Sequence, residues 1–147
     1  MELKNKKAIV TGGASGFGFG IVKNFIENGA KVIIADQNID LAKEKTKKFG
    51  KKCFCIKVDV SNNSQIQELK DECIKVFGSI DIIVNNAGIT HLPNELESIT
   101  EEDFDRVLKV NTKSVFLMSK TFVPLMKKHN YGVILNIAST AGVSPRP

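Results

Sequence analysis

The sequence predicts an α/β fold in which a doubly wound parallel sheet of five strands has helices on both faces. Short apolar runs alternate along the chain with stretches of helical hydrophobic periodicity. The second run, residues 31–36, is apolar almost throughout, which is typical of parallel strands covered on both faces. A glycine-rich turn separates the first run from the first helical stretch. The 147 residues, 42% of them hydrophobic, suit one domain spanning residues 1–147.

The elements follow one another in the order that such a sheet requires. Strands are expected at residues 7–11, 31–36, 53–60, 80–85 and 132–139, and helices at 18–28, 39–49, 62–77 and 104–128. Gly29, Gly50 and Gly78 would end the first three helices. Ser61 would cap the third, and Pro124 would kink or shorten the fourth. Residues 100–103, Thr-Glu-Glu-Asp, resemble a capping box in which Asp replaces Glu.

The charge pattern argues against nucleic-acid and membrane partners. The net charge of +5 comes from scattered lysines with one cluster at residues 43–52, and only two arginines are present. Nucleic-acid-binding surfaces usually add arginine or stacking aromatics, so the cluster is interpreted as a solvated helix face. The charged start and the short apolar runs favour neither a signal peptide nor a membrane span, so we expect a cytoplasmic protein.

The three cysteines do not form a recognisable disulfide or metal framework. Cys53 and Cys55 would share one face of a strand, and Cys73 lies in a helix. The Cys-x-Cys spacing is not a common zinc pattern, and both histidines are distant in sequence. We therefore expect buried or half-buried thiols and no metal site.

The glycine-rich turn predicts a dinucleotide site. In a doubly wound sheet the first strand-to-helix turn presents backbone N–H groups and the positive helix end to a phosphate. Gly12 would allow the tight turn, Gly16 would let the backbone approach a pyrophosphate, and Gly18 would let the helix pack on the strand. Ser15 and Phe17 complete the expected cofactor-binding turn.

Asp36 indicates which dinucleotide is bound. It ends the second strand, where a carboxylate can accept hydrogen bonds from the adenosine ribose and repel a 2′-phosphate. The cofactor is therefore expected to be NAD, with NADP less favoured because of this charge. An ordinary turn residue is the alternative interpretation of Asp36, and the lysine cluster is the only argument for NADP.

Five stretches together resemble the classical short-chain dehydrogenase/reductase family, whose fold is Rossmann-like. The similarity extends along the whole chain. The stretches are residues 11–18 (TGGASGFG), Asp59 with Val60, residues 85–88 (NNAG), residues 110–116 (VNTKSVF) and residues 136–142 (NIASTAG).

The resemblance implies roles for further residues. Asp59 and Val60 would flank the adenine, and the cofactor ribose would be lined by Asn86, Ala87 and Gly88. Ser139 would hydrogen-bond the substrate oxygen, and Asn111 would break the long helix and hold a water of a proton relay. A strand-end hydroxyl and a helix-surface amide are the alternative interpretations of these last two.

The chain departs from the family pattern at its C-terminal end. The family's Tyr-x-x-x-Lys motif would follow the fifth strand, whereas Tyr131 precedes it and has no lysine four positions later. The fold is therefore expected to be C-terminally incomplete, with the fifth strand at an exposed sheet edge. We expect the 147-residue chain alone to be inactive, and the full-length protein to form a homo-oligomer through the long helix.

The resemblance implies an NAD-dependent oxidoreductase. It would transfer hydride between the nicotinamide and a small-molecule secondary alcohol or ketone of the 3-oxoacyl thioester, sugar or polyol class. A non-catalytic dinucleotide-binding module is the first alternative. An S-adenosylmethionine methyltransferase also has a glycine-rich first turn and an acid after the second strand, but residues 85–88 and Ser139 do not fit it.

Overall fold

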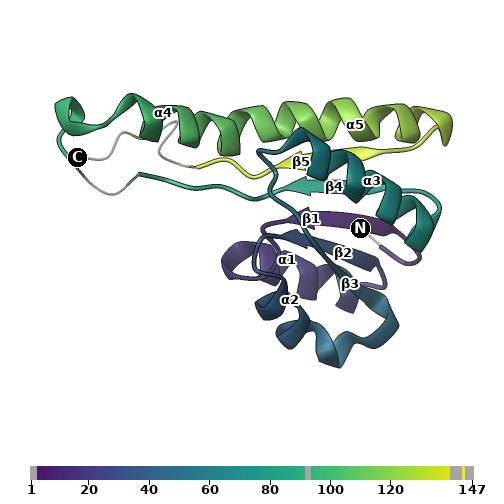
Figure 1. The fold of residues 1–147 in the computed structure, drawn as a ribbon. Helices are drawn as coiled ribbons and strands as arrows, with labels where there is room; N and C mark the ends of the chain where they lie inside the picture. The colour runs from purple at the N-terminus through teal and green to yellow at the C-terminus, as the bar shows by residue number, and fades with distance from the viewer. Residues whose placement is uncertain (1–2, 92–93, 140–143, 145–147) are drawn as a thin grey trace.

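Five parallel strands form a single sheet in the order β3-β2-β1-β4-β5 (Figure 1). The computed structural model describes residues 3–91, 94–139 and 144. The strands are β1 (Lys7–Thr11), β2 (Lys31–Asp36), β3 (Cys53–Lys57), β4 (Ile82–Asn85) and β5 (Val133–Asn136). In register, Ile9 of β1 lies beside Ile33 of β2 and Ile83 of β4. This order and the parallel pairing confirm the predicted doubly wound sheet.

Helices cover both faces of the sheet, as the alternation of elements predicts. One face packs on α1 (Gly16–Glu27) and α2 (Ile39–Thr46), and the other packs on α3 (Asn63–Phe77) and α5 (Ser114–Lys128). Alternate residues of one strand point to opposite faces, so each central strand contributes to both cores. Val10 packs in the α1 core and Ile9 in the core that contains Phe122 of α5.

The C-terminal ends of the first and third helices follow the sequence prediction, whereas the N-terminal cap of the third helix does not. Gly29 and Gly78, with φ of +92° and +74°, follow the first and third helices as expected. The cap of α3 is Asn62, not Ser61: the Asn62 side chain accepts N–H bonds from residues 64 and 65 at 2.9 and 3.3 Å. The prediction for Ser61 was wrong: the helix begins one residue later, at Asn63, and Ser61 donates its N–H and hydroxyl to Asp59 at 2.8 and 2.7 Å.

The second helix is shorter than predicted. The α-helix ends at Thr46, and the 3₁₀ segment η1 (Lys47–Lys52) continues to β3, with Gly50 at a φ of +53°. Five of the six clustered lysines are exposed and Lys45 is half-buried over the Phe19 ring, in agreement with a solvated face. None of the helices in the described ranges is long and apolar enough to cross a membrane.

The long fourth helix divides into three pieces. An α-helix, α4 (Glu101–Leu108), is followed by a π-helical turn, η3 (Lys109–Lys113), and then by α5 (Ser114–Lys128). α4 and α5 lie end to end in Figure 1. A short 3₁₀ turn, η2 (Leu96–Ser98), precedes them. Pro124 does not end α5, because Phe122 and Met126 on either side of it are buried in the core.

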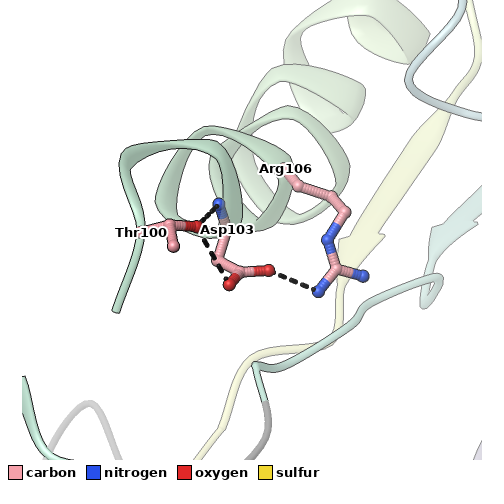
Figure 2. A network of polar contacts seen from close by, with 3 residues as sticks. All are labelled: Thr100, Asp103 and Arg106. Carbon is pink, nitrogen blue, oxygen red and sulfur yellow. Dashed lines mark hydrogen bonds and ion pairs between the residues drawn. The ribbon is translucent and has the colours of Figure 1, made fainter. Parts of the chain in front are cut away.

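Thr100 caps α4, as the capping-box pattern predicts. Its hydroxyl oxygen accepts the N–H of Asp103 at 3.1 Å and also lies 3.1 Å from the Asp103 carboxylate (Figure 2). Arg106 binds the other carboxylate oxygen at 3.1 Å. In a standard capping box, the side chain at the third helical position accepts the backbone N–H of the cap residue. Here the Asp103 carboxylate, at that position, bonds to the Thr100 hydroxyl instead.

β5 forms an exposed edge among the described strands. Ile134 packs toward the α5 core, whereas Val133 and Leu135 point to the opposite face and are 41% and 45% exposed. Ile137, which follows the strand, is exposed as well. The predicted apolar edge at the fifth strand is therefore present in the structure.

Candidate functional site

A cavity of about 410 Å³ lies beyond the carboxyl ends of the strands. Five segments line it: the turn after β1, the end of β2, the segments after β3 and after β4, and the π-helical turn η3. Ten of the predicted cofactor residues are in its wall: Gly12, Ser15, Gly16, Phe17, Gly18, Asp36, Val60, Asn86, Ala87 and Gly88. The wall also contains five residues that were not predicted: Ala35, Gln37, Val58, Ile89 and Val110.

The turn after β1 favours glycine at three positions. Gly12 has a φ of +63°, and a Cβ there would lie 2.9 Å from the Ala87 Cα. A Cβ on Gly18 would lie 2.1 Å from the Gly12 carbonyl oxygen, closer than any real contact. The backbone of α1 thus packs directly against the turn, as predicted for Gly18. Gly16 has a φ of +52°, which favours glycine, and no atom lies within 4 Å of a Cβ built on it, so the space beside it is open.

The amino end of α1 points donors into this cavity wall. Helix geometry leaves the N–H groups of the first turn without intrahelical acceptors. Ser15, at the N-cap, makes no side-chain capping bond, and no acidic residue lies in the first turn. An anion in the cavity would therefore meet backbone donors and the positive end of a 12-residue helix.

Two backbone donors fix the Asp36 carboxylate. One oxygen accepts the N–H of Ala14 at 2.9 Å, and the other accepts the N–H of Asn38 at 2.9 Å. The contact with Ala14 ties the end of β2 to the glycine-rich turn. A carboxylate oxygen has a second acceptor direction, so both oxygens can still bind a ligand hydroxyl.

Asp59 lies between two residues of the cavity wall. Val58 and Val60 line the cavity. One Asp59 oxygen accepts both the N–H and the hydroxyl of Ser61, at 2.8 and 2.7 Å. Ser61, at the start of the connection to α3, therefore orients the Asp59 side chain. The second carboxylate oxygen of Asp59 can accept a hydrogen bond from a ligand.

Thr11 joins the segment after β4 to the turn after β1. Its buried hydroxyl accepts the N–H groups of Asn86 and Ala87, both at 3.0 Å. The Asn86 amide in turn donates to the carbonyls of Thr11 and Gly12 at 3.0 and 3.1 Å. Sequence reasoning did not assign Thr11 a role, although its position directly before Gly12 at the end of β1 was the available signal.

Of the two predicted catalytic residues, Asn111 lies within η3 and Ser139 follows β5. Asn111 lies in the π-helical turn, so the helix is broken locally where the resemblance implied, and its side chain pairs with the Ile89 backbone. Ser139 follows β5, whose carboxyl end is tied to β4 by the 2.8 Å bond from Asn85 to Asn136. Residues 140–142 of the last motif lie outside the described residues.

These features agree with the comparison of the chain with protein families. Residues 6–147 match the family described as short chain dehydrogenase. The chain belongs to the short chain dehydrogenase family. This is an oxidoreductase family, and the predicted resemblance is confirmed.

Individual relatives are similar along nearly the whole chain. The chain is 39% identical to 4-formylbenzenesulfonate dehydrogenase of Comamonas testosteroni, over 100% of its own length and 60% of the relative. It is 38% identical to galactitol 2-dehydrogenase of Agrobacterium fabrum, over 97% and 56%. A crystal structure of 3-ketoacyl-(acyl-carrier-protein) reductase from Brucella melitensis with NADH matches with a TM-score of 0.94 at 38% identity, over 99% and 62%. The chain thus spans about three fifths of the length of these short chain dehydrogenases.

Proposed function

We propose that residues 1–147 form the dinucleotide-binding domain of an NAD-dependent oxidoreductase. The reaction would transfer hydride between the nicotinamide and the carbon of a secondary alcohol or ketone. The family supports the reaction class, and relatives named for a polyol and for a 3-ketoacyl thioester support these substrate classes. The single observation that carries the cofactor assignment is the Asp36 carboxylate in the wall of the glycine-rich cavity.

The residues present fit a dinucleotide. Gly16 leaves open space at the amino end of α1, so a pyrophosphate could approach the backbone N–H groups there. The wall after β4, held by Thr11, would support the ribose near Asn86, Ala87 and Gly88. Val58 and Val60 offer apolar surface to an adenine, and Asp59 between them can accept from its amino group. When bound, the nicotinamide supplies the hydride acceptor or donor.

Asp36 would select the unphosphorylated ribose. Its oxygens are fixed by Ala14 and Asn38 and can each accept one more hydrogen bond. A 2′-phosphate would place a second negative group beside a carboxylate, and the described lining contains no lysine or arginine to offset the repulsion. We therefore assign NAD as the cofactor, and NADP as the weaker ligand.

Calorimetric titration with NADH and NADPH tests this assignment. The unmodified chain should bind NADH at least about tenfold more tightly, since a charge-assisted bond contributes roughly 1.5–3 kcal/mol. Asp36→Asn should reduce this preference. Asp40→Asn, which removes an exposed carboxylate four residues further on, is the matched control and should leave it unchanged. Equal affinity of the unmodified chain for both nucleotides would contradict the proposal.

Ser139 and Asn111 would serve the substrate side of the reaction. A substrate oxygen that gains or loses a proton during hydride transfer needs a polarising hydrogen bond and an acid–base group. Ser139 can supply the first, and Asn111 can hold a water beside the Ile89 segment. The only tyrosine, Tyr131, precedes β5 and packs under Lys6, with the ammonium 3.7 Å from the ring centroid. It is not placed to be the acid–base group.

A non-catalytic dinucleotide-binding module is the second candidate, because the cavity lined by the glycine-rich turn and Asp36 can bind a dinucleotide without any catalytic group. Purified chain is incubated with NAD and a panel of secondary alcohols, and NADH absorbance is followed. We expect binding without turnover for this chain. The same assay on the longest natural gene product separates the candidates, because turnover there supports the dehydrogenase and binding alone supports the module.

A further inference from the structure

Two thiols lie together on the edge strand β3, away from the cofactor cavity. Cys53 and Cys55 occupy alternate positions of the strand, so their side chains share one face. Both are half-buried and pack against the core on the α1 and α2 side. None of the residues that line the hollow beside them also lines the cofactor cavity.

A surface hollow of about 280 Å³ is lined by both cysteines. Cys53 and Cys55 form one side, and Lys43, Thr46 and Lys47 from the end of α2 and the start of η1 form another. The Thr46 hydroxyl oxygen is 3.3 Å from the Cys55 sulfur, and the hydroxyl also donates to the Ala42 carbonyl at 2.7 Å. Thr46 is buried, so its contact with Cys55 holds the sulfur next to the end of α2.

The surroundings shift the pKa values of the two thiols in opposite directions. A hydrogen bond from the Cys53 thiol lowers the pKa of Cys55 to about 6, and the charge of Lys43 acts in the same direction against the effect of burial. The same hydrogen bond, together with burial, raises the pKa of Cys53. Cys55 is therefore the more acidic thiol of the pair, and Cys53 keeps its proton to higher pH.

We propose that Cys55 is a thiol–disulfide exchange site that accepts small anionic disulfides, whose negative groups are held by Lys43 and Lys47. The Cys55 thiolate attacks one sulfur of the disulfide. A new bond forms between that sulfur and Cys55, the original S–S bond breaks, and the other half leaves as a thiolate. The products are a mixed disulfide at Cys55 and one free thiolate, so no further oxidant is needed.

The pH at which Cys55 reacts separates this site from an ordinary cysteine. At pH 6 about half of Cys55 is thiolate, compared with about 0.3% of a free cysteine. Intrinsic nucleophilicity falls by roughly tenfold over this difference in pKa, so a net rate advantage of about tenfold remains. Cys73 is an internal reference, because complete burial in the α3 core raises its pKa to about 12.

The test compares two disulfide probes on the folded 147-residue chain. 5,5′-Dithiobis(2-nitrobenzoate) is anionic and cystamine is cationic, and intact and peptide mass spectrometry locates each adduct. We expect Cys55 to react with the anionic probe more than about tenfold faster than a free-cysteine peptide at pH 6, and to have a clearly smaller advantage over the peptide with cystamine, because the lysines attract the first probe and repel the second. Cys53→Ala should raise the pH midpoint of the Cys55 reaction by at least about one unit.

Charge variants test the role of the hollow. Lys43→Gln with Lys47→Gln should remove most of the preference for the anionic probe. Lys51→Gln with Lys52→Gln changes the net charge equally at exposed positions outside the hollow and should keep it. Circular dichroism verifies that each variant is folded. Reaction of Cys55 with the anionic probe at the peptide rate at pH 6, or an equal advantage over the peptide with both probes, would overturn the proposal.

Discussion

Asn111 pairs with the backbone of Ile89 through two hydrogen bonds. Its carbonyl oxygen accepts the Ile89 N–H at 2.9 Å, and its amide donates to the Ile89 carbonyl at 2.8 Å. The two residues are 22 positions apart, so this contact joins the π-helical turn to the segment that follows β4. A Cβ on Gly88 would lie 3.5 Å from the Asn111 oxygen, which places this pair beside the cavity wall.

Replacing Asn111 should loosen the segment after β4. Asn111→Ala removes both bonds and should lower the free energy of unfolding by about 1–2 kcal/mol, since each exposed bond contributes about 1 kcal/mol at most. Hydrogen exchange at the Ile89 amide should become markedly faster. Thr112→Ala, one position further in the same turn, is the control and should change neither quantity. An unchanged Ile89 exchange rate in Asn111→Ala would contradict the structural role.

The glycines of α1 should respond oppositely to alanine. Gly18→Ala places a Cβ 2.1 Å from the Gly12 carbonyl, so α1 must move away from the turn. Such overpacking costs about 1–3 kcal/mol, and nucleotide affinity should fall with it. Gly20→Ala meets no atom within 4 Å and should stabilise the chain by about 0.5–1 kcal/mol through helix propensity. Urea unfolding measures both, and equal effects would contradict the packing argument.

The candidate site was largely predictable because it is built at strand ends. Parallel strands with right-handed connections bring their carboxyl ends to one edge, so residues that follow β1, β2 and β4 must meet there. The positions of Gly12, Asp36 and Gly88 depend on this topology and not on details of side-chain packing. Periodicity and terminal glycines were enough to locate all five strands and the C-terminal ends of α1 and α3, although β3, β4 and β5 are shorter than the predicted 53–60, 80–85 and 132–139 and α1 begins at Gly16.

What could not be predicted depends on contacts between distant residues. The π-helical turn accompanies the pairing of Asn111 with Ile89, which hydrophobic periodicity does not reveal. The bonds of Thr11 to residues 86 and 87 also need the folded sheet. The wrong cap at Ser61 has a local cause, because Ser61 and Asn62 are adjacent residues of types that cap helices and the sequence does not show which of them directly precedes the first helical residue.

The buried thiol of Cys73 should make the chain less stable at alkaline pH. Burial raises its pKa to about 12, so the folded chain keeps a proton that the unfolded chain loses above its own pKa, about 8.5–9. The stabilisation is complete below about pH 8.5 and is lost between there and pH 12. Between pH 9 and 10 the unmodified chain should lose up to about 1.4 kcal/mol more than Cys73→Ala. Chemical denaturation of both at these pH values measures the difference, and parallel curves would refute it.

The 147-residue chain should self-associate, and two exposed apolar surfaces can be distinguished. Phe104 and Phe116, on α4 and α5, are 58% and 60% exposed, and Leu135 is exposed on the β5 edge. We propose that the full-length protein forms a homo-oligomer through α4 and α5, which would bury both phenylalanines against a second copy. Exposed β5 would add less specific association, because an unpaired edge strand can bind another chain.

Light scattering after size-exclusion chromatography tests this prediction. We expect a mass above the 16.1 kDa of one chain. Phe116→Asp should abolish a defined oligomer, because the interface would then bury an unpaired carboxylate. Leu135→Lys should instead remove only the association that grows steadily with concentration. Lys128→Asp, at the end of α5, is the charge control and should alter neither. A monomer at every concentration tested would contradict the prediction, and a defined oligomer that survives Phe116→Asp would place the interface elsewhere.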